Sequence, residues 1–221
     1  MKRYFIIYIT LFIFLLCCCH NQGTAKDVDL NQTLLLECRK GNVQGVENCL
    51  RQKADVNVID QNGFTPLMVA SSQGHNKVVQ LLLLTGADTE KKDQIGMTSL
   101  MFASLAGHVP VVRLLLLAGA DIGVRDNDGM TPLILASAKG HTDVVQVILV
   151  AGANIEERDK TGTTPLMWSS FAGHASIVRL LLLAGANTQA RDNQGKTPLM
   201  IALEGGHQEV VNILKESENK K

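Results

Sequence analysis

The chain has 221 residues, and its 21 Lys and Arg residues balance 21 Asp and Glu residues, so the formal net charge at pH 7 is zero. This balance, with no basic run outside Lys220 and Lys221, argues against a nucleic-acid-binding protein. Hydrophobic residues make up 46% and aromatic residues only 4%, which excludes a disordered chain and predicts a core of Leu, Val, Ile, Ala and Met.

The first segment, residues 1–19, is predicted to be an export signal. Lys2 and Arg3 precede a run of 13 mostly apolar residues, 4–16. That length fits the hydrophobic region of a secretory signal, about 7 to 15 residues, whereas a membrane-spanning helix needs about 20. An uncleaved anchor helix is the alternative, because the cysteines that follow extend the run.

Residues 17–19 are three consecutive cysteines, and they resemble the lipobox of bacterial lipoproteins, in which a Leu lies three places before a lipidated Cys. Leu15 has this relation to Cys18, and Leu16 has it to Cys19. The resemblance therefore implies lipidation at one of these two cysteines. The departure from the pattern is the residue directly before the cysteine, which is another Cys instead of Gly, Ala or Ser.

A second possibility for the N-terminus is ordinary cleavage after Ala25, because Gly23 and Ala25 approximate a small-x-small site. The polar residues 20–31 are predicted to be a tether. In the lipidated case the protein is exported and held by its N-terminal lipid to a bacterial envelope membrane, in the periplasm or on the cell surface.

From residue 32 onward the chain repeats itself every 33 residues. Thr-x-Leu elements begin at Thr65, Thr98, Thr131, Thr164 and Thr197, and Gly-His pairs begin at Gly74, Gly107, Gly140, Gly173 and Gly206. This period and the Thr-Pro-Leu start resemble the ankyrin repeat family. The resemblance implies an all-α repeat fold, an α-solenoid of about six helix-turn-helix units with β-hairpin fingers.

Six units follow from the period. They are an N-terminal capping repeat at 32–64, four repeats at 65–97, 98–130, 131–163 and 164–196, and a C-terminal capping repeat with a charged tail at 197–221.

The unit 131–163 shows why each repeat should form two helices. Thr131 can cap the first helix with its hydroxyl, and Pro132 occupies the first helical position, where a missing N–H costs nothing. Gly140 is expected to end that helix. A second helix, predicted at 142–151, should end at Gly152, which can adopt the left-handed conformation.

No catalytic motif appears in the chain: it has no phosphate-binding loop, no His-Glu-x-x-His and no nucleophile elbow. One histidine per repeat places successive imidazoles about 8 to 10 Å apart, too far to share a zinc ion. Cys38 and Cys49 are expected to be buried free thiols, with a disulfide as the alternative, and Trp168 is expected in the core. We therefore predict a protein that is not an enzyme and that has no metal or cofactor.

The family resemblance implies partner binding through the finger tips and the exposed side of the first helices, which form a concave face. By position these contact residues are Phe64, Lys92, Met97, Leu105, Arg125, Met130, Lys139, Arg158, Phe171 and Arg191. A basic row beside an apolar strip would suit a protein partner with an acidic-apolar face. The alternative is that the basic side chains are solvated and pair with nearby aspartates.

A second surface follows from the helical period of 100° per residue, which places one apolar residue of each inner repeat on the outer side of the second helix. These residues are Leu84, Leu117, Val150 and Leu183. Arg51 and Glu216 take the same position in the end units. A contiguous apolar ridge on the convex side can mark association or membrane contact, and partial burial is the alternative.

The resemblance as a whole implies a non-enzymatic protein–protein interaction scaffold, exported and lipid-anchored in a bacterial envelope. Two alternatives stay open: a soluble secreted protein that binds another cell's proteins, and an accessory or inhibitor subunit of an envelope enzyme.

Overall fold

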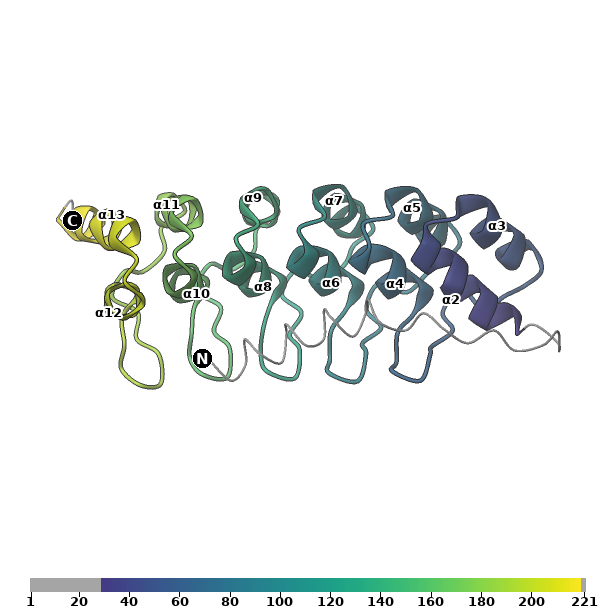
Figure 1. Ribbon diagram of the computed structural model, residues 1–221, viewed down its shortest axis with the longest axis horizontal. Helices are drawn as coiled ribbons and strands as arrows, with labels where there is room; N and C mark the ends of the chain where they lie inside the picture. Colours follow the sequence, from purple (N-terminus) through teal and green to yellow (C-terminus); the bar gives the residue numbers. More distant parts are fainter. Residues whose placement is uncertain (1–28, 220–221) are drawn as a thin grey trace.

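The computed structural model describes residues 29–219, and this part of the chain contains twelve α-helices and no β-strand. The helices form six pairs, one pair per repeat (Figure 1). In chain order they are α2 (Leu30–Lys40), α3 (Val43–Arg51), α4 (Pro66–Ser72), α5 (Asn76–Leu84), α6 (Ser99–Ala106), α7 (Val109–Leu117), α8 (Pro132–Lys139), α9 (Thr142–Val150), α10 (Pro165–Ala172), α11 (Ala175–Leu183), α12 (Pro198–Gly205) and α13 (Gln208–Glu218).

The pairs stack side by side into an elongated array with two rows of helices. The even-numbered helices form one row and the odd-numbered helices the other, and the long loops project from the even-numbered row (Figure 1). Each helix packs against its partner in the pair and against the corresponding helices of the neighbouring repeats. Stability therefore comes from nearest-neighbour contacts, as in other repeat proteins.

The local signals of the fourth repeat act as expected. The Thr131 hydroxyl accepts a hydrogen bond from Ile134 N at 3.4 Å, and Pro132 is the first residue of α8. Gly140 ends α8 with φ 82°, and Gly152, with φ 90°, follows the end of α9. Both glycines adopt the left-handed conformation that residues with a Cβ avoid.

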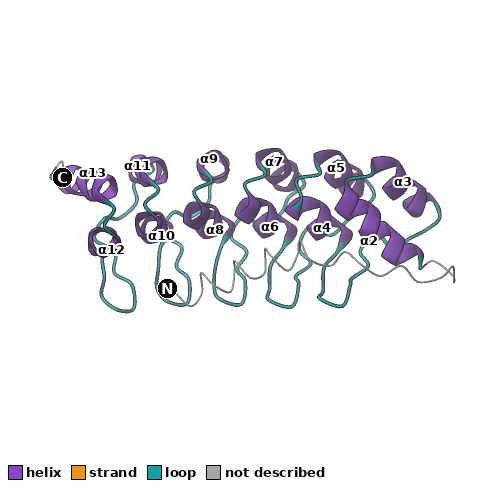
Figure 2. Ribbon diagram, viewed as in Figure 1, coloured by secondary structure: helices purple, strands orange, loops and turns teal. Residues whose placement is uncertain are grey.

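The fingers are loops closed by turns, so the expectation of β-hairpins is wrong for the described residues (Figure 2). In the finger after α9 two backbone hydrogen bonds close the turn, from Asp159 N to Thr163 O at 3.2 Å and from Gly162 N to Asp159 O at 3.0 Å. The Asp159 carboxylate accepts from the N–H groups of Thr161 and Thr163. A side chain thus takes donors that would pair across a hairpin.

The first helix of the N-terminal capping repeat begins three residues earlier than the period predicts. Asp29 caps α2 by accepting a hydrogen bond from Asn31 N at 3.0 Å, so the helix starts at Leu30, inside the predicted tether. At the other end of this repeat Lys53 has φ 69°, where later repeats have glycine.

Replacing Lys53 with glycine should stabilise the protein by about 0.5–1 kcal/mol, because a side chain at positive φ costs more than the chain entropy of glycine. The free energy of unfolding in urea measures this gain. Gly119→Lys is the matched reverse change, because Gly119 has φ 88° at the equivalent position two repeats later, and it should be destabilising. Equal unfolding free energies for wild type and Lys53→Gly would contradict the strain.

Candidate functional site

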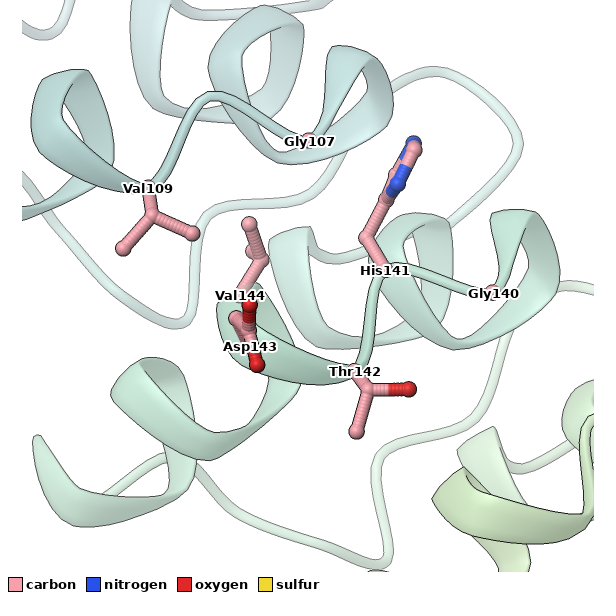
Figure 3. Close-up of a pocket in the computed structure, with 7 residues that line it drawn as sticks. All are labelled: Gly107, Val109, Gly140, His141, Thr142, Asp143 and Val144. Carbon is pink, nitrogen blue, oxygen red and sulfur yellow. The ribbon is translucent and has the colours of Figure 1, made fainter.

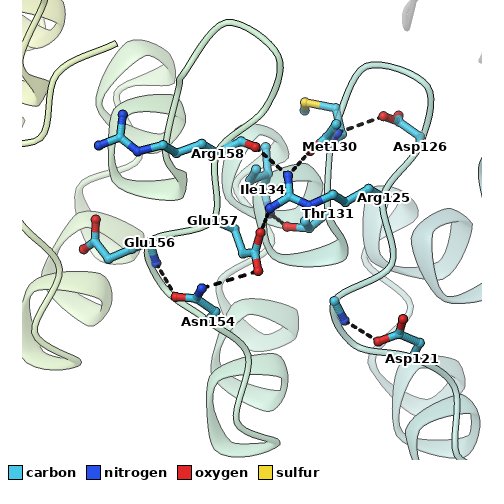
Figure 4. Close-up of polar contacts among 12 residues, drawn as sticks. Asp121, Arg125, Asp126, Met130, Thr131, Ile134, Asn154, Glu156, Glu157 and Arg158 are labelled. Carbon is cyan, nitrogen blue, oxygen red and sulfur yellow. Dashed lines mark hydrogen bonds and ion pairs between the residues drawn. The ribbon is translucent and has the colours of Figure 1, made fainter.

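The predicted basic row of the fingers is tied to the protein's own backbone. Arg125 Nη1 donates to Gly129 O in its own finger at 3.1 Å and to Arg158 O in the next finger, and its guanidinium forms an ion pair with Glu157 (Figure 4). The expected alternative, pairing with nearby aspartates, is not what the structure shows for Arg125, whose acidic partner is a glutamate of the following repeat.

The same contact recurs along the array. Arg158 Nη1 donates to Gly162 O at 3.1 Å and to Arg191 O at 2.7 Å, and Lys92 Nζ donates to Arg125 O at 2.9 Å. Lys92, Arg125 and Arg158 therefore each link their finger to the finger 33 residues later, whereas Arg191 donates to Gly195 O of its own finger. The row has a structural role that the sequence did not indicate.

Arg158→Ala should lower the free energy of unfolding by about 1–2 kcal/mol, because it removes two hydrogen bonds from a charged donor to carbonyls. Arg179→Ala is the control. Arg179 is an exposed arginine of α11 with Glu209 at 3.8 Å, and its loss should change stability by less than about 0.5 kcal/mol. Urea unfolding of both variants checks this, and equal effects would mean that the contacts between fingers contribute nothing.

Two predicted contact residues, Met97 and Met130, are buried and cannot meet a partner. Their exposed fractions are 0% and 5%, and both belong to an apolar cluster that includes Phe102 and Trp168. The backbone N–H of each donates at 2.8 Å to the turn aspartate four residues earlier. This bond fixes the finger so that the methionine side chain turns into the core.

The remaining apolar contact residues lie half-buried at the edge of that cluster. Phe64 packs on Phe102 with ring centroids 5.2 Å apart, and Phe171 meets Trp168 edge-on at 6.1 Å. Leu105 packs against the same cluster. These side chains are held in place from below while part of their surface reaches solvent, which is the arrangement of preorganised apolar anchors.

Lys139 is the basic residue of the first helices in this region. It is the last residue of α8 and is half-buried, and desolvation lowers the pKa of its ammonium group. A partly desolvated ammonium gains more from a partner carboxylate than a fully hydrated one does. We call Phe64, Leu105, Lys139 and Phe171, together with the finger residues Lys92, Arg125, Arg158 and Arg191, the finger-side surface.

Trp168 is in the core, as predicted, with an exposed fraction of 5%. Its Nε1 donates to Asp159 Oδ2 at 2.9 Å. The opposite carboxylate oxygen accepts from Thr161 N, Thr161 Oγ1 and Thr163 N at 2.6–2.9 Å. The indole therefore connects the first helix of its repeat to the finger of the preceding repeat.

The histidines of the five Gly-His pairs each link one repeat to the repeat before it. In every case Nε2 contacts a backbone carbonyl 36 residues earlier, at 2.9–3.3 Å. The residues are His75, His108, His141, His174 and His207. No group of three or more His, Cys, Asp or Glu residues within 29–219 could hold a metal ion.

Acidification should weaken the array through these histidines. Desolvation lowers the pKa of His141 and His174 below the usual 6.5. Because the folded state favours the neutral imidazole, the unfolded chain binds protons first as the pH falls, and the stabilising contribution present above 6.5 is lost below it. The free energy of unfolding should fall between pH 7.5 and 5.5, and less steeply for His141→Gln with His174→Gln. An unchanged slope in that variant would contradict the assignment.

A hollow of about 280 Å³ lies where the first turns of α7 and α9 approach each other (Figure 3). Its lining includes His141 and Asp143, with small and apolar residues around them. His141 is already bonded to Leu105 O at 3.0 Å, and Asp143 is an exposed acid in the first turn of α9. The hollow is a gap between repeats and not a set of converging reactive groups.

Cys38 and Cys49 are both buried and free, in agreement with the prediction. Burial raises the pKa of the Cys38 thiol to about 12, which makes it unreactive at neutral pH. The predicted lipidation residues Cys18 and Cys19 lie outside the described residues. Within residues 29–219 no helix is long and apolar enough to cross a membrane.

The four residues of the predicted convex ridge face solvent. Leu84, Leu117, Val150 and Leu183 have exposed fractions of 79%, 86%, 84% and 85%. We call these four residues the apolar ridge. The alternative of partial burial is wrong, because all four side chains are exposed, and each is the last residue of its second helix.

Comparisons with known proteins agree with this architecture. A search of curated proteins returned no match. A scan of protein families matched the family described as ankyrin repeats (3 copies) at residues 9–93, 34–126, 83–159, 100–192 and 148–221. These matches cover nearly the whole chain, and the chain belongs to the ankyrin repeat family, whose arrays serve as protein–protein interaction scaffolds.

Proposed function

We propose that this protein binds a protein partner on its finger-side surface and has no catalytic activity of its own. The observation that carries the proposal is the set of half-buried apolar side chains Phe64, Leu105 and Phe171, which border the buried cluster beside Lys139. Preformed apolar anchors bind with little loss of side-chain entropy, and aromatic residues are enriched at interfaces.

The partner chemistry follows from the same side chains. An apolar segment would cover the anchors, and a carboxylate would meet the Lys139 ammonium, so an acidic-apolar face fits. The arginines contribute less than a free basic row would, because part of each guanidinium is engaged with finger carbonyls. Arg125 has a side-chain exposed fraction of 43%, so part of its surface remains open to a partner although Nη1 and Nη2 are engaged within the protein.

Site-specific photo-crosslinking in the native cell tests the surface. A photoreactive amino acid at Lys139 should give a discrete adduct with one protein. The same amino acid at Gln146, exposed on α9 of the same repeat, is the matched control and should not give that adduct. Adding Leu105→Glu should abolish the adduct at 139. Crosslinking at 146 in place of 139 would show that the partner binds on the other side of the array.

We further propose that the protein is exported and anchored by lipid at Cys18 or Cys19. The support is the basic start, the apolar run and the cysteine cluster of the sequence. Two or more acyl chains on one cysteine would anchor the protein more firmly than a single chain does.

Metabolic labelling with a radioactive fatty acid tests this anchor. The wild-type chain should be labelled and should sediment with membranes. Cys18→Ser and Cys19→Ser, made separately, identify the modified residue, and Cys17→Ser is the control that should remain labelled. An unlabelled protein whose mature chain begins after Ala25 would instead support the soluble secreted form.

A further inference from the structure

The apolar ridge has a simple linear form. Its four side chains repeat every 33 residues, each at the C-terminal end of a second helix. The glycines that follow two residues later, Gly86, Gly119, Gly152 and Gly185, have open space where a Cβ would be. The ridge therefore consists of large apolar side chains beside an uncrowded backbone, against which a second set of side chains can lie.

The two ends of the ridge carry opposite charges. Arg51 holds the ridge position in the first repeat and Glu216 holds it in the last, and both are exposed. Arg51 also pairs with Glu47 one turn earlier on its own helix, with Nη2 at 2.7 Å from Oε1, and its side chain remains 68% exposed. Read from the N-terminal end, the ridge positions hold one cation, four apolar residues and one anion. A second copy in antiparallel orientation places Arg51 opposite Glu216 at both ends, whereas a parallel copy places like charges together.

The apolar positions also match in the antiparallel orientation. Leu84 then lies opposite Leu183, and Leu117 opposite Val150, so that every apolar side chain meets another. Beside the ridge, the second helices carry charges of both signs: Arg113 lies one turn before Leu117, and Asp143 lies two turns before Val150. The mixture of charge signs around the ridge fits a copy of the same chain better than an anionic membrane surface.

The ridge is long enough to cross a standard interface in one dimension, and the helix surfaces on either side of it would have to supply the rest of the buried area. Four repeats at helix-packing distances of about 10 Å give a strip about 30 Å long. A standard interface buries about 800 Å² on each partner, which corresponds to a patch about 28 Å across.

We propose that the apolar ridge is the interface of an antiparallel two-fold dimer, with Leu117 against Val150 of the second copy at the centre and Arg51 against Glu216 at each end. Such a dimer leaves both finger-side surfaces free, because the fingers project from the other row of helices (Figure 1). Each dimer would present two partner-binding surfaces, which raises apparent affinity for a partner that has more than one copy of its epitope.

Sedimentation of the full-length chain in a non-ionic detergent tests the dimer. Wild type should contain two chains per particle. Leu117→Glu with Val150→Glu should weaken association by at least about 100-fold, because it leaves carboxylates unpaired in an apolar interface. Ile59→Glu is the control, because Ile59 is an exposed apolar residue of a finger with an exposed fraction of 58%. It should remain dimeric. Circular dichroism verifies that each variant is folded.

A charge exchange tests the antiparallel register. Arg51→Glu alone and Glu216→Arg alone should each weaken the dimer about 10-fold, and the two changes in one chain should restore it. Failure of the double variant to recover would overturn the register. A monomeric wild type, a dimer that survives the central glutamates, or a monomer that binds phosphatidylcholine vesicles through the ridge would overturn the proposal.

Discussion

Gly107→Ala should lower the free energy of unfolding by about 3 kcal/mol, although it adds only one methyl group. Gly107 has φ 80°, where a Cβ costs about 1–2 kcal/mol. That Cβ would also lie 2.5 Å from Nδ1 and 2.7 Å from Cε1 of His141 in the next repeat. The imidazole would have to move, and its 3.0 Å contact with Leu105 O would be lost. Urea unfolding followed by circular dichroism measures the effect.

Gly119→Ala separates the backbone cost of a Cβ at positive φ from the cost of displacing the imidazole. Gly119 has φ 88°, but nothing lies within 4 Å of its Cβ position, so it should pay only the backbone cost of about 1 kcal/mol. In a His141→Ala background Gly107→Ala should also cost only about 1 kcal/mol, because the ring that it displaces is gone. Equal costs for both glycine variants in the wild-type background would show that the Gly-His contact between repeats is not tight.

The repeat architecture was predictable because the residues that start and end the helices recur every 33 residues, and each acts in the same way in every repeat. Thr131, Pro132, Gly140 and Gly152 act through local backbone geometry, which a single repeat already determines, and the structure confirms each of them. The outward position of the apolar ridge could also be predicted from the sequence, because it depends only on the angle between successive residues of one helix.

The finger contacts were less predictable because they depend on how one repeat meets the next. The sequence places Arg125 and Met130 at finger positions but does not show that the guanidinium reaches Arg158 O or that the methionine turns inward. One feature of the sequence could have predicted these contacts. The basic residue of the finger recurs at 33-residue spacing, so a contact between one pair of neighbouring fingers implies the same contact between the other pairs. The β-hairpin expectation failed similarly, because the turn aspartates take the N–H groups of the loop.

Asp159→Ala should destabilise the protein by at least about 3 kcal/mol, since one carboxylate holds four donors from two layers of the structure. The change leaves the N–H groups of Thr161 and Thr163 without their acceptor and leaves the Trp168 indole N–H unpaired in the core. Burying an unsatisfied donor costs about 1–3 kcal/mol, more than the net value of the bond itself. Urea unfolding measures the loss, with circular dichroism as the probe.

Asp93→Ala is the matched control, because Asp93 is the turn aspartate two repeats earlier and Phe102, which takes the position of Trp168 there, has no side-chain N–H to donate. Its carboxylate accepts from Ile95 N at 3.0 Å and Met97 N at 2.8 Å, and burial raises its pKa, so part of what it contributes is offset by desolvation. We expect its removal to cost about 1–2 kcal/mol. Trp168→Phe should then be less costly in the Asp159→Ala background than in wild type, because the indole has no acceptor left to lose. Additive effects of Asp159→Ala and Trp168→Phe would show that the helix layer does not hold the finger through this bond. The orientation of Arg158, which directly precedes Asp159, would then depend on its hydrogen bonds to Gly162 O and Arg191 O.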